Sequence, residues 1–257
     1  MRSIILIALI GLLFSCTSND KKQNRSKNLT DQFKSFDTIV SFSGYWLSED
    51  YYNSIMQFKS PKRAQKGSQF VFVPGRTLQQ TIMIHDFHEG GAFMKIVKHG
   101  DHYEFWGVQE DSLTQEFFSV EIISTTKIKL GDKTFVKINP AKSKHNYRIL
   151  EEILFEGQYV SFDGKSIEFK PNGQVTGLDD FTYYEPIIDY FDAGMQVDQV
   201  GLGNSENDLD WYGFKFNNDT LEIYTLSCLS LEGTNNKCVE VDYGRLKYKL
   251  WKIIKVI

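Results

Sequence analysis

Alternation of apolar and polar residues dominates the chain after residue 67. Short runs with an apolar residue at every second position fill residues 78–138 and 155–253, and Gly, Asp and Asn residues separate them. In the last run Leu246, Tyr248 and Leu250 share one face, and basic residues occupy the other. A period of two with regular turn signals is typical of antiparallel strands that bury one face. The pattern therefore predicts an all-β fold made of antiparallel meanders.

Two short segments depart from this period and repeat apolar residues at spacings of three and four, the period of one helical face. The first begins after Ser48, which has the side chain of an N-cap, and ends before Pro61. The second covers residues 147–155. We expect short accessory helices at both places. The chain then divides into a first β unit at 36–140, a helical linker at 141–154 and a second β unit at 155–257.

The two β units open with the same local pattern. Phe42-Ser43-Gly44-Tyr45-Trp46 and Phe155-Glu156-Gly157-Gln158-Tyr159 both follow the order Phe-x-Gly-x-aromatic. A pattern that recurs at the start of each unit indicates duplication of a β unit. We therefore favour two tandem barrels, and one larger antiparallel barrel is the alternative.

The start of the chain has the composition of an export signal. Arg2 precedes a run from Ile4 to Phe14 in which every residue except Gly11 is apolar. This run is too short to cross a bilayer as a helix, which needs about 20 residues. A basic start, an apolar middle and a small residue before the cut are typical of a cleaved signal peptide. We place the signal peptide at residues 1–15.

The end of this segment resembles the lipobox of bacterial lipoproteins, in the residues Leu13-Phe14-Ser15-Cys16. The resemblance implies that Cys16 carries acyl chains such as palmitate. The residue directly after this cysteine is Thr17 rather than Asp, which resembles lipoproteins that travel on to the outer membrane. Residues 16–35 are polar and contain too few apolar side chains to fold, which predicts a flexible tether. An ordinary cleaved signal with an incidental cysteine is the alternative.

Charge and cysteine content narrow the function classes. The 257 residues have a formal net charge of -4, so the chain lacks the basic field that nucleic-acid binding needs. If Cys16 carries lipid, Cys228 and Cys238 remain, in a chain exported to an oxidising compartment. Disulfides persist in such compartments. We expect a Cys228–Cys238 disulfide, with two unpaired thiols as the alternative.

The opening strand of the first unit resembles that of lipocalins and fatty-acid-binding proteins, in the residues Phe42-x-Gly44-x-Trp46 with a short helix directly behind them. More broadly, the chain is similar to the lipocalin-like lipoproteins of Gram-negative bacteria. The resemblance implies that Trp46, and Tyr159 in the second unit, plug barrel ends. It also implies a basic residue late in the barrel that packs on Trp46, for which Arg245 is the nearest candidate.

Aromatic residues gather beside Pro186 in a stretch without a clear period, at Tyr183, Tyr184, Tyr190 and Phe191. Packing in the core is one explanation. The other is a barrel mouth or lid, where aromatic walls with a few polar groups suit a small apolar or sugar-like ligand.

The sequence contains only weak signals for a metal site or a catalytic site. The histidine pairs 85/88 and 99/102 flank a predicted strand at 92–98, too far apart for one metal site. The acidic loop at 204–210 lacks the Gly and the Glu of a calcium loop. No nucleophile elbow, phosphate loop or dinucleotide fingerprint is present. We expect no metal, no cofactor and no enzymatic activity.

These patterns predict a lipid-anchored lipoprotein of the cell envelope, held at the outer membrane through its acyl chains. Its expected function is non-catalytic binding of a small apolar or amphipathic ligand. The alternative is a structural or adaptor lipoprotein, whose barrels are filled by their own side chains and whose loops bind an envelope protein or a glycan. No nucleic-acid partner is expected.

Overall fold

The computed structural model describes part of the 257-residue chain, and all of the described residues belong to one compact unit, Ser35–Ile257. The predicted signal peptide, Cys16, the tether and Phe191 lie outside the described residues. In the described part no helix is long and apolar enough to cross a membrane. The described ranges are 44–64, 69–73, 81–86, 90–100, 102–109, 112–138, 148–190, 196–233 and 237–254.

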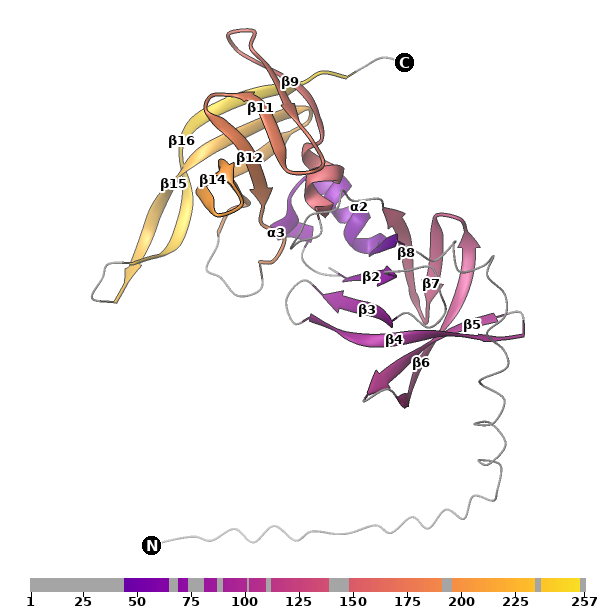
Figure 1. The fold of residues 1–257 in the computed structure, drawn as a ribbon. Coiled ribbons are helices and arrows are strands. Elements are labelled where there is room, and N and C mark those ends of the chain that lie inside the picture. Colours follow the sequence, from indigo (N-terminus) through magenta and orange to yellow (C-terminus); the bar gives the residue numbers. More distant parts are fainter. Residues whose placement is uncertain are drawn as a thin grey trace, which may run out of the picture. The chain divides into compact units, whose positions relative to one another are not determined.

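The first barrel is a closed antiparallel sheet whose strands follow one another in sequence order, from purple to pink in Figure 1. Each strand pairs with the next, and β8 returns to β1, where Lys137 lies opposite Trp46. Its strands are β1 (Gly44–Ser48), β2 (Gln69–Val73), β3 (Thr81–Asp86), β4 (Gly90–His99), β5 (His102–Gln109), β6 (Ser112–Ser124), β7 (Lys127–Leu130) and β8 (Lys133–Ile138).

The second barrel repeats this up-and-down order. Its first strand, β9, pairs with both β10 and the last strand, β16, so that this sheet also closes. The strands β15 and β16 are the longest pair and extend beyond the others in Figure 1. The strands are β9 (Gly157–Ser161), β10 (Ser166–Phe169), β11 (Gln174–Leu178), β12 (Phe181–Pro186), β13 (Gln199–Ser205), β14 (Asp208–Asn217), β15 (Thr220–Glu232) and β16 (Lys237–Lys252).

Burial alternates along the strands, as expected when one face lines a barrel and the other faces water. In β5 the residues Tyr103 and Phe105 are buried and their neighbours are more exposed. In β10 Ile167 and Phe169 are buried in the same way. The predicted all-β fold with two tandem antiparallel barrels is confirmed, and the alternative of one larger barrel is wrong.

Two short helices follow β1. The first, α2 (Glu49–Phe58), begins at the predicted cap: the backbone N–H of Tyr51 donates to the Ser48 hydroxyl oxygen at 3.3 Å. The helix buries Tyr51 and Ile55 and ends at Lys59, which has a left-handed φ of 51°. Proline then opens α3 (Pro61–Ala64), where its missing N–H costs nothing.

The predicted helical linker ends in a single π-helical turn, η1 (Glu151–Phe155). The N–H of Glu156 donates to the carbonyl of Glu151 at 2.7 Å, a spacing of five residues instead of four. Periodicity alone could not distinguish this wider turn from an α-helix. Phe155, the last residue of this turn and two residues before β9, is fully buried.

Two strands were not expected. The strand β2 is short, and the strand β12 occupies the start of the aromatic stretch that was predicted to be irregular. Its residues pair with β11 on one side and with β13 on the other. Pro186 is tolerated because it is the last residue of the strand.

Candidate functional site

The end of the second barrel at which β9 begins is filled by aromatic rings. The ring centroid of Phe155 lies 5.8 Å from that of Phe169, 5.4 Å from Tyr184 and 5.0 Å from Phe214. These distances and tilted or edge-to-face angles are those of favourable aromatic pairs. We call this end the plugged end. A ligand there would have to displace four rings that contact one another.

The repeated Gly-x-aromatic pattern occupies the same position in both barrels. Gly44 in β1 has a φ of 121°, a value that favours glycine. The stem of Lys137, from the last strand, crosses it so closely that a Cβ on Gly44 would lie 3.2 Å from the lysine Cε. The Lys137 ammonium then lies 5.2 Å from the ring centroid of Trp46, within cation–π range.

The second barrel has the corresponding arrangement. Gly157 has a φ of 144°, and its Cβ would lie 2.7 Å from the Cε of Lys252. The Lys252 ammonium lies 5.6 Å from the ring centroid of Tyr159, which is fully buried. Tyr159 also donates its hydroxyl to the carbonyl of Phe155 at 2.9 Å. The Gly-x-aromatic parts of the two repeated patterns are therefore structurally equivalent, while Phe42 lies outside the described residues.

The basic residue on Trp46 is Lys137, and this corrects the assignment of Arg245. Arg245 is exposed, and its backbone N–H donates to the hydroxyl oxygen of Thr225 at 2.9 Å. Burial lowers the pKa of Lys137 and of Lys252. The signal for Lys252 was available, because it lies two residues after Leu250 on the apolar face of the last run.

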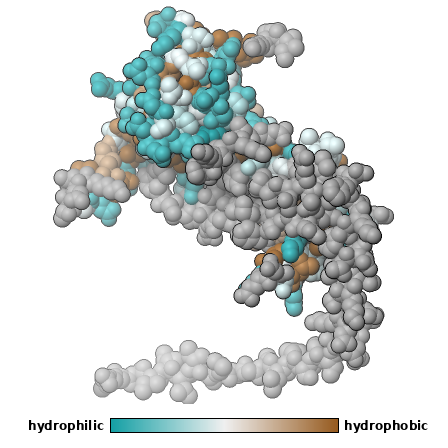
Figure 2. Space-filling model, in the orientation of Figure 1, coloured by the Kyte–Doolittle hydropathy of each residue, from teal (hydrophilic) through white to brown (hydrophobic). Residues whose placement is uncertain are grey.

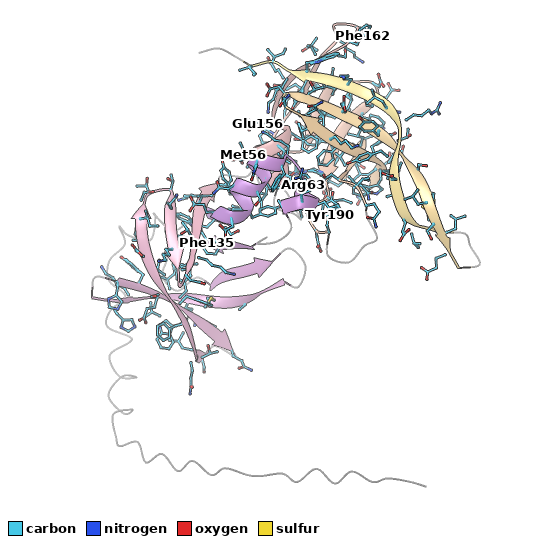
Figure 3. All side chains as sticks on the ribbon, turned by 180° about the vertical axis from the view of Figure 1, so that it is seen from behind. Met56, Arg63, Phe135, Glu156, Phe162 and Tyr190 are labelled. Atoms are coloured by element: carbon cyan, nitrogen blue, oxygen red, sulfur yellow. A yellow bond between two sulfur atoms is a disulfide. The ribbon has the colours of Figure 1, made fainter. Side chains whose placement is uncertain are left out.

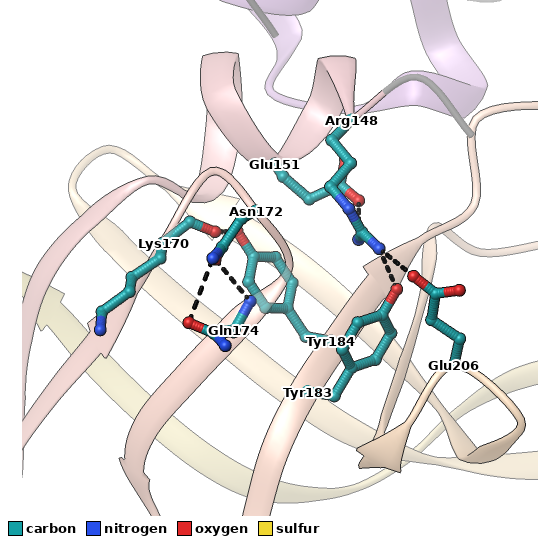
Figure 4. Close-up of polar contacts among 8 residues, drawn as sticks. All are labelled: Arg148, Glu151, Lys170, Asn172, Gln174, Tyr183, Tyr184 and Glu206. Atoms are coloured by element: carbon teal, nitrogen blue, oxygen red, sulfur yellow. Dashed lines mark hydrogen bonds and ion pairs between the residues drawn. The ribbon is translucent and has the colours of Figure 1, made fainter. Parts of the chain in front are cut away.

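A buried ionic cluster lies against the second barrel (Figure 4). Arg148 is only 4% exposed, and its guanidinium donates to Glu151 at 3.1 Å, to Glu206 at 2.7 Å and to the hydroxyl of Tyr183. A side chain at Gly173 would clash with Arg148, since its Cβ would lie 2.1 Å from Nη1. Sequence reasoning missed this cluster because Tyr183 and Glu206 lie far from Arg148 in the chain, where no local pattern marks them.

Burial has the largest effect on the pKa values of Glu151 and Tyr183 in this cluster. It raises the pKa of Glu151 to about 8, although the guanidinium of Arg148 acts in the opposite direction. It raises the pKa of Tyr183 to about 12. Because the guanidinium of Arg148 already donates to Glu151, Glu206 and Tyr183, the cluster has the character of a structural brace rather than of an anion site.

The three described tyrosines of the predicted aromatic pocket have different partners. Tyr183 lies under Arg148, whereas its neighbour Tyr184 belongs to the plugged end and donates its hydroxyl to the carbonyl of Lys170 at 2.8 Å. Tyr190 is buried, and its hydroxyl oxygen accepts the N–H of Gln199 at 2.8 Å. The three described tyrosines are thus buried in separate environments, and Phe191 lies outside the described residues, so the shared ligand pocket stays a prediction.

A hollow of about 420 Å³ lies at the other end of the second barrel, between the β9–β10 turn, the β11–β12 turn and β16. Its floor consists of the buried side chains of Ile167, Leu178 and Leu250. Phe162 stands on its rim at the outer tip of the β9–β10 turn and is 92% exposed (Figure 3). We call this hollow the mouth cup.

Both carboxylates of the mouth cup already have partners. Asp179 accepts the hydroxyl of Tyr248 at 2.5 Å and lies 3.6 Å from the ammonium of Lys165. Asp163 accepts the hydroxyl of Ser161, and this hydrogen bond lowers the pKa of Asp163. Asp179 is therefore paired with a lysine of the cup, whereas Asp163 keeps its negative charge beside a neutral hydroxyl donor.

Lys247 has a different environment. Its ammonium lies 5.7 Å from the ring centroid of Phe181, 5.2 Å from that of Tyr212 and 5.4 Å from that of Tyr248. Among the described residues no carboxylate pairs with it, whereas Lys249 pairs with Glu222 at 3.1 Å. The mouth cup thus combines an apolar floor, an exposed aromatic rim and one ammonium held by aromatic rings.

Sequence reasoning missed the mouth cup. One signal existed: Phe162 occupies a turn of the type Ser-Phe-Asp-Gly, where small and polar residues are usual. Lys247 had no such signal. Alternation assigns it to the wet face, where the structure also leaves it exposed. The register between β15 and β16 shifts between Ile223 and Tyr224, opposite this lysine.

The Cys228–Cys238 disulfide is confirmed and joins β15 to β16. His85 lies opposite Gly91 at one end of β4, and His99 lies opposite His102 at the other end, while His88 lies outside the described residues. Within the ranges that the structure describes, no group of three or more histidine, cysteine, aspartate or glutamate residues could hold a metal ion.

No protein-family model, no curated protein and no solved structure matches this chain.

Proposed function

We propose that this chain is a lipid-anchored protein of the cell envelope that binds a small amphipathic ligand, without catalysis, in the mouth cup. One observation carries the proposal: the cup has an apolar floor and an almost fully exposed Phe162 on its rim. Its volume of about 420 Å³ is within the range of small-molecule sites. Covering Phe162 with an apolar ligand would remove from water a side chain whose burial is worth about 1.5–3 kcal/mol.

The charge of the cup favours an anionic head group on the ligand. The lining of the cup contains Lys165, Lys247 and Lys249 against Asp163 and Asp179, and among the described residues no carboxylate pairs with Lys247. A hydrogen bond to a charged group contributes about 1.5–3 kcal/mol. A ligand with a carboxylate or a similar anion beside a short apolar body would satisfy both parts of the cup.

Dodecanoate is a suitable probe, with dodecyltrimethylammonium as a cation of the same chain length. We would titrate both, below their micelle-forming concentrations, into the full-length Cys16→Ser chain, which lacks the proposed anchor and keeps every described residue. Isothermal calorimetry should show dodecanoate binding at least about tenfold more tightly, because of the charge-assisted contact with Lys247. Equal affinities for the two probes would contradict the proposed head-group class.

Matched variants locate the binding. Lys247→Gln should weaken dodecanoate binding by about tenfold, and Phe162→Ser should weaken both probes. The control variants are Lys170→Gln and Ile253→Ser, which line a hollow at the plugged end. If the control variants weaken binding as much as the cup variants do, the ligand binds elsewhere.

The anchor has its own test. Metabolic labelling with an alkyne analogue of palmitate should label the wild-type chain and leave Cys16→Ser unlabelled. The variant should also leave the membrane fraction, because two or three acyl chains provide the membrane affinity. Retention of an unlabelled wild-type chain in the membrane fraction would contradict lipidation at Cys16.

The second candidate function is an adaptor that binds an envelope protein or a glycan. It is favoured by the β15–β16 hairpin, which extends beyond the other strands and exposes Leu229 and Leu231.

A further inference from the structure

The outer parts of β15 and β16 form a two-stranded projection that we call the arm, residues 226–232 and 237–243. These residues pair with each other, from Leu226 opposite Tyr243 to Glu232 opposite Lys237. Among the described strands, β14 pairs with β15 only as far as Tyr224, and β9 pairs with β16 only from Leu250. The arm therefore lacks a third strand in the part of the sheet that the structure describes.

Apolar side chains are concentrated on this arm. Leu229 is 59% exposed and Leu231 is 60% exposed, and Val239 on the facing strand is also exposed. Figure 2 shows hydrophobic residues on the projecting hairpin. Single exposed apolar residues are ordinary, but several on one small element are typical of an interaction site.

The Cys228–Cys238 disulfide lies within the arm and joins its two strands. A two-stranded hairpin is marginally stable by itself in water. Cys228 and Cys238 join the two strands beyond the last residues that a third strand supports. Holding the hairpin in one conformation reduces the ordering cost when a partner binds. The disulfide therefore preorganises the exposed apolar residues.

The charges of the arm select among possible occupants. Glu232, Glu240 and Asp242 stand against Lys237 alone, so the arm is acidic. A second copy of the arm would bring like charges together, and the negative surface of an anionic bilayer would repel it. A protein segment with Lys or Arg beside apolar residues complements both features.

We propose that the arm is a docking site for an extended segment of a partner protein in which basic and apolar residues alternate. The apolar residues of the segment would cover Leu229, Leu231 and Val239, and its basic residues would meet the arm's carboxylates. The open strand edges of the arm would supply main-chain hydrogen bonds to such a segment. This site is separate from the mouth cup and does not depend on the ligand proposed there.

The test uses a fluorescein-labelled peptide of alternating Val and Lys, and a matched peptide of alternating Val and Glu. Fluorescence anisotropy with the full-length Cys16→Ser chain should show binding of the basic peptide at least about tenfold more tightly than of the acidic one. Raising the salt concentration should weaken it. Equal binding of both peptides, or binding of neither, would overturn the proposal.

Variants assign the binding to the arm. Leu229→Ser with Leu231→Ser should weaken the basic peptide about tenfold, with an unchanged melting temperature because both side chains are exposed. The control, Ile253→Ser with Ile254→Ser, changes residues that are 45% and 64% exposed outside the arm and should bind as the wild type does. An arm variant that binds as tightly as the wild type would place the peptide elsewhere and overturn the proposal.

Two further measurements separate the occupants. Cys228→Ser with Cys238→Ser should weaken the basic peptide and increase amide exchange in residues 226–243. Analytical ultracentrifugation should show a monomer for the wild-type chain. A dimer that the Leu229→Ser, Leu231→Ser variant dissociates would make a second copy the occupant, and sedimentation with phosphatidylglycerol vesicles that the same variant abolishes would make it a membrane. Either result would overturn the proposed protein partner.

Discussion

The two ends of the second barrel contain hollows of nearly equal size and opposite character. The hollow at the plugged end, about 410 Å³, is lined mainly by polar residues such as Glu156, Gln158 and Glu168, beside a barrel interior packed with rings. The mouth cup, about 420 Å³, has an apolar floor and the exposed Phe162. Volume alone therefore does not distinguish a ligand site. The mouth cup differs by the almost fully exposed Phe162 and by Lys247, with which no carboxylate among the described residues pairs.

The plugged end contributes to the stability of the second barrel, whereas the mouth cup is the part proposed to bind a ligand. Groups at the plugged end have partners, as the Phe155 rings and the Lys252–Tyr159 contact illustrate. At the mouth, Phe162 contributes almost no burial. Substitutions at the plugged end should therefore change the free energy of unfolding, and substitutions at the mouth should change affinity.

The largest contrast is expected between Phe155→Ala and Phe162→Ala. Removing the fully buried Phe155 ring leaves a cavity among four rings and should lower the free energy of unfolding by about 3–5 kcal/mol. Phe162→Ala should change it by less than about 0.5 kcal/mol. Urea unfolding followed by tryptophan fluorescence measures both. A loss below about 1 kcal/mol for Phe155→Ala would mean that the plugged end is loosely packed.

Ionisation of Glu151 should produce the next largest effect. Its pKa in the folded protein, about 8, lies above its ordinary value of 4.5, so the folded state binds this proton more tightly. The resulting stability is fully present below pH 4.5 and is lost as the pH rises through 8. We expect a loss of about 2–4 kcal/mol between roughly pH 5 and pH 9.

The variant Glu151→Gln isolates this effect, because glutamine can still accept a hydrogen bond from Arg148 but does not ionise. Its free energy of unfolding should vary less with pH than that of the wild type. Parallel pH profiles for the two chains, measured by urea unfolding, would show that Glu151 is ionised in the folded protein throughout this range.

A smaller effect is expected at the glycines of the repeated pattern. Gly157→Ala and Gly44→Ala should each destabilise the chain by about 1–3 kcal/mol, because both have a positive φ. The loss should be greater for Gly157, where a Cβ would lie 2.7 Å from Lys252 Cε rather than 3.2 Å from Lys137 Cε. Shortening the lysine with Lys252→Ala should reduce the cost of Gly157→Ala. A cost unaffected by Lys252→Ala would leave backbone strain as the sole cause.

Features with a local pattern could be predicted from the sequence. The alternation of Leu246, Tyr248 and Leu250 marked the last strand, and the Phe-x-Gly-x-aromatic echo marked the tandem barrels. Spacing and compartment were enough for the Cys228–Cys238 disulfide. In each case the determinant lies within a few residues or within the composition of the chain.

The candidate site depends on closure of the second barrel, which joins residues far apart in sequence. Lys247 meets Phe181 and Tyr212 only because the sheet closes and the β15–β16 register shifts nearby. Tyr183 and Tyr184 were grouped as neighbours in sequence, but adjacent strand residues face opposite sides. Neither fact can be read from one sequence without the pairing of its strands.

Methyl NMR spectra of the full-length Cys16→Ser chain, recorded as dodecanoate is added, test the mouth cup most directly. The methyl signals of Ile167, Leu178 and Leu250 should shift with increasing ligand, since these side chains form the floor of the cup. Those of Val175 and Val200, buried in the same core but absent from the lining of the cup, should shift much less. Shifts centred on Val175 and Val200, or on Ile96 and Ile128 of the first barrel, would contradict binding in the mouth cup.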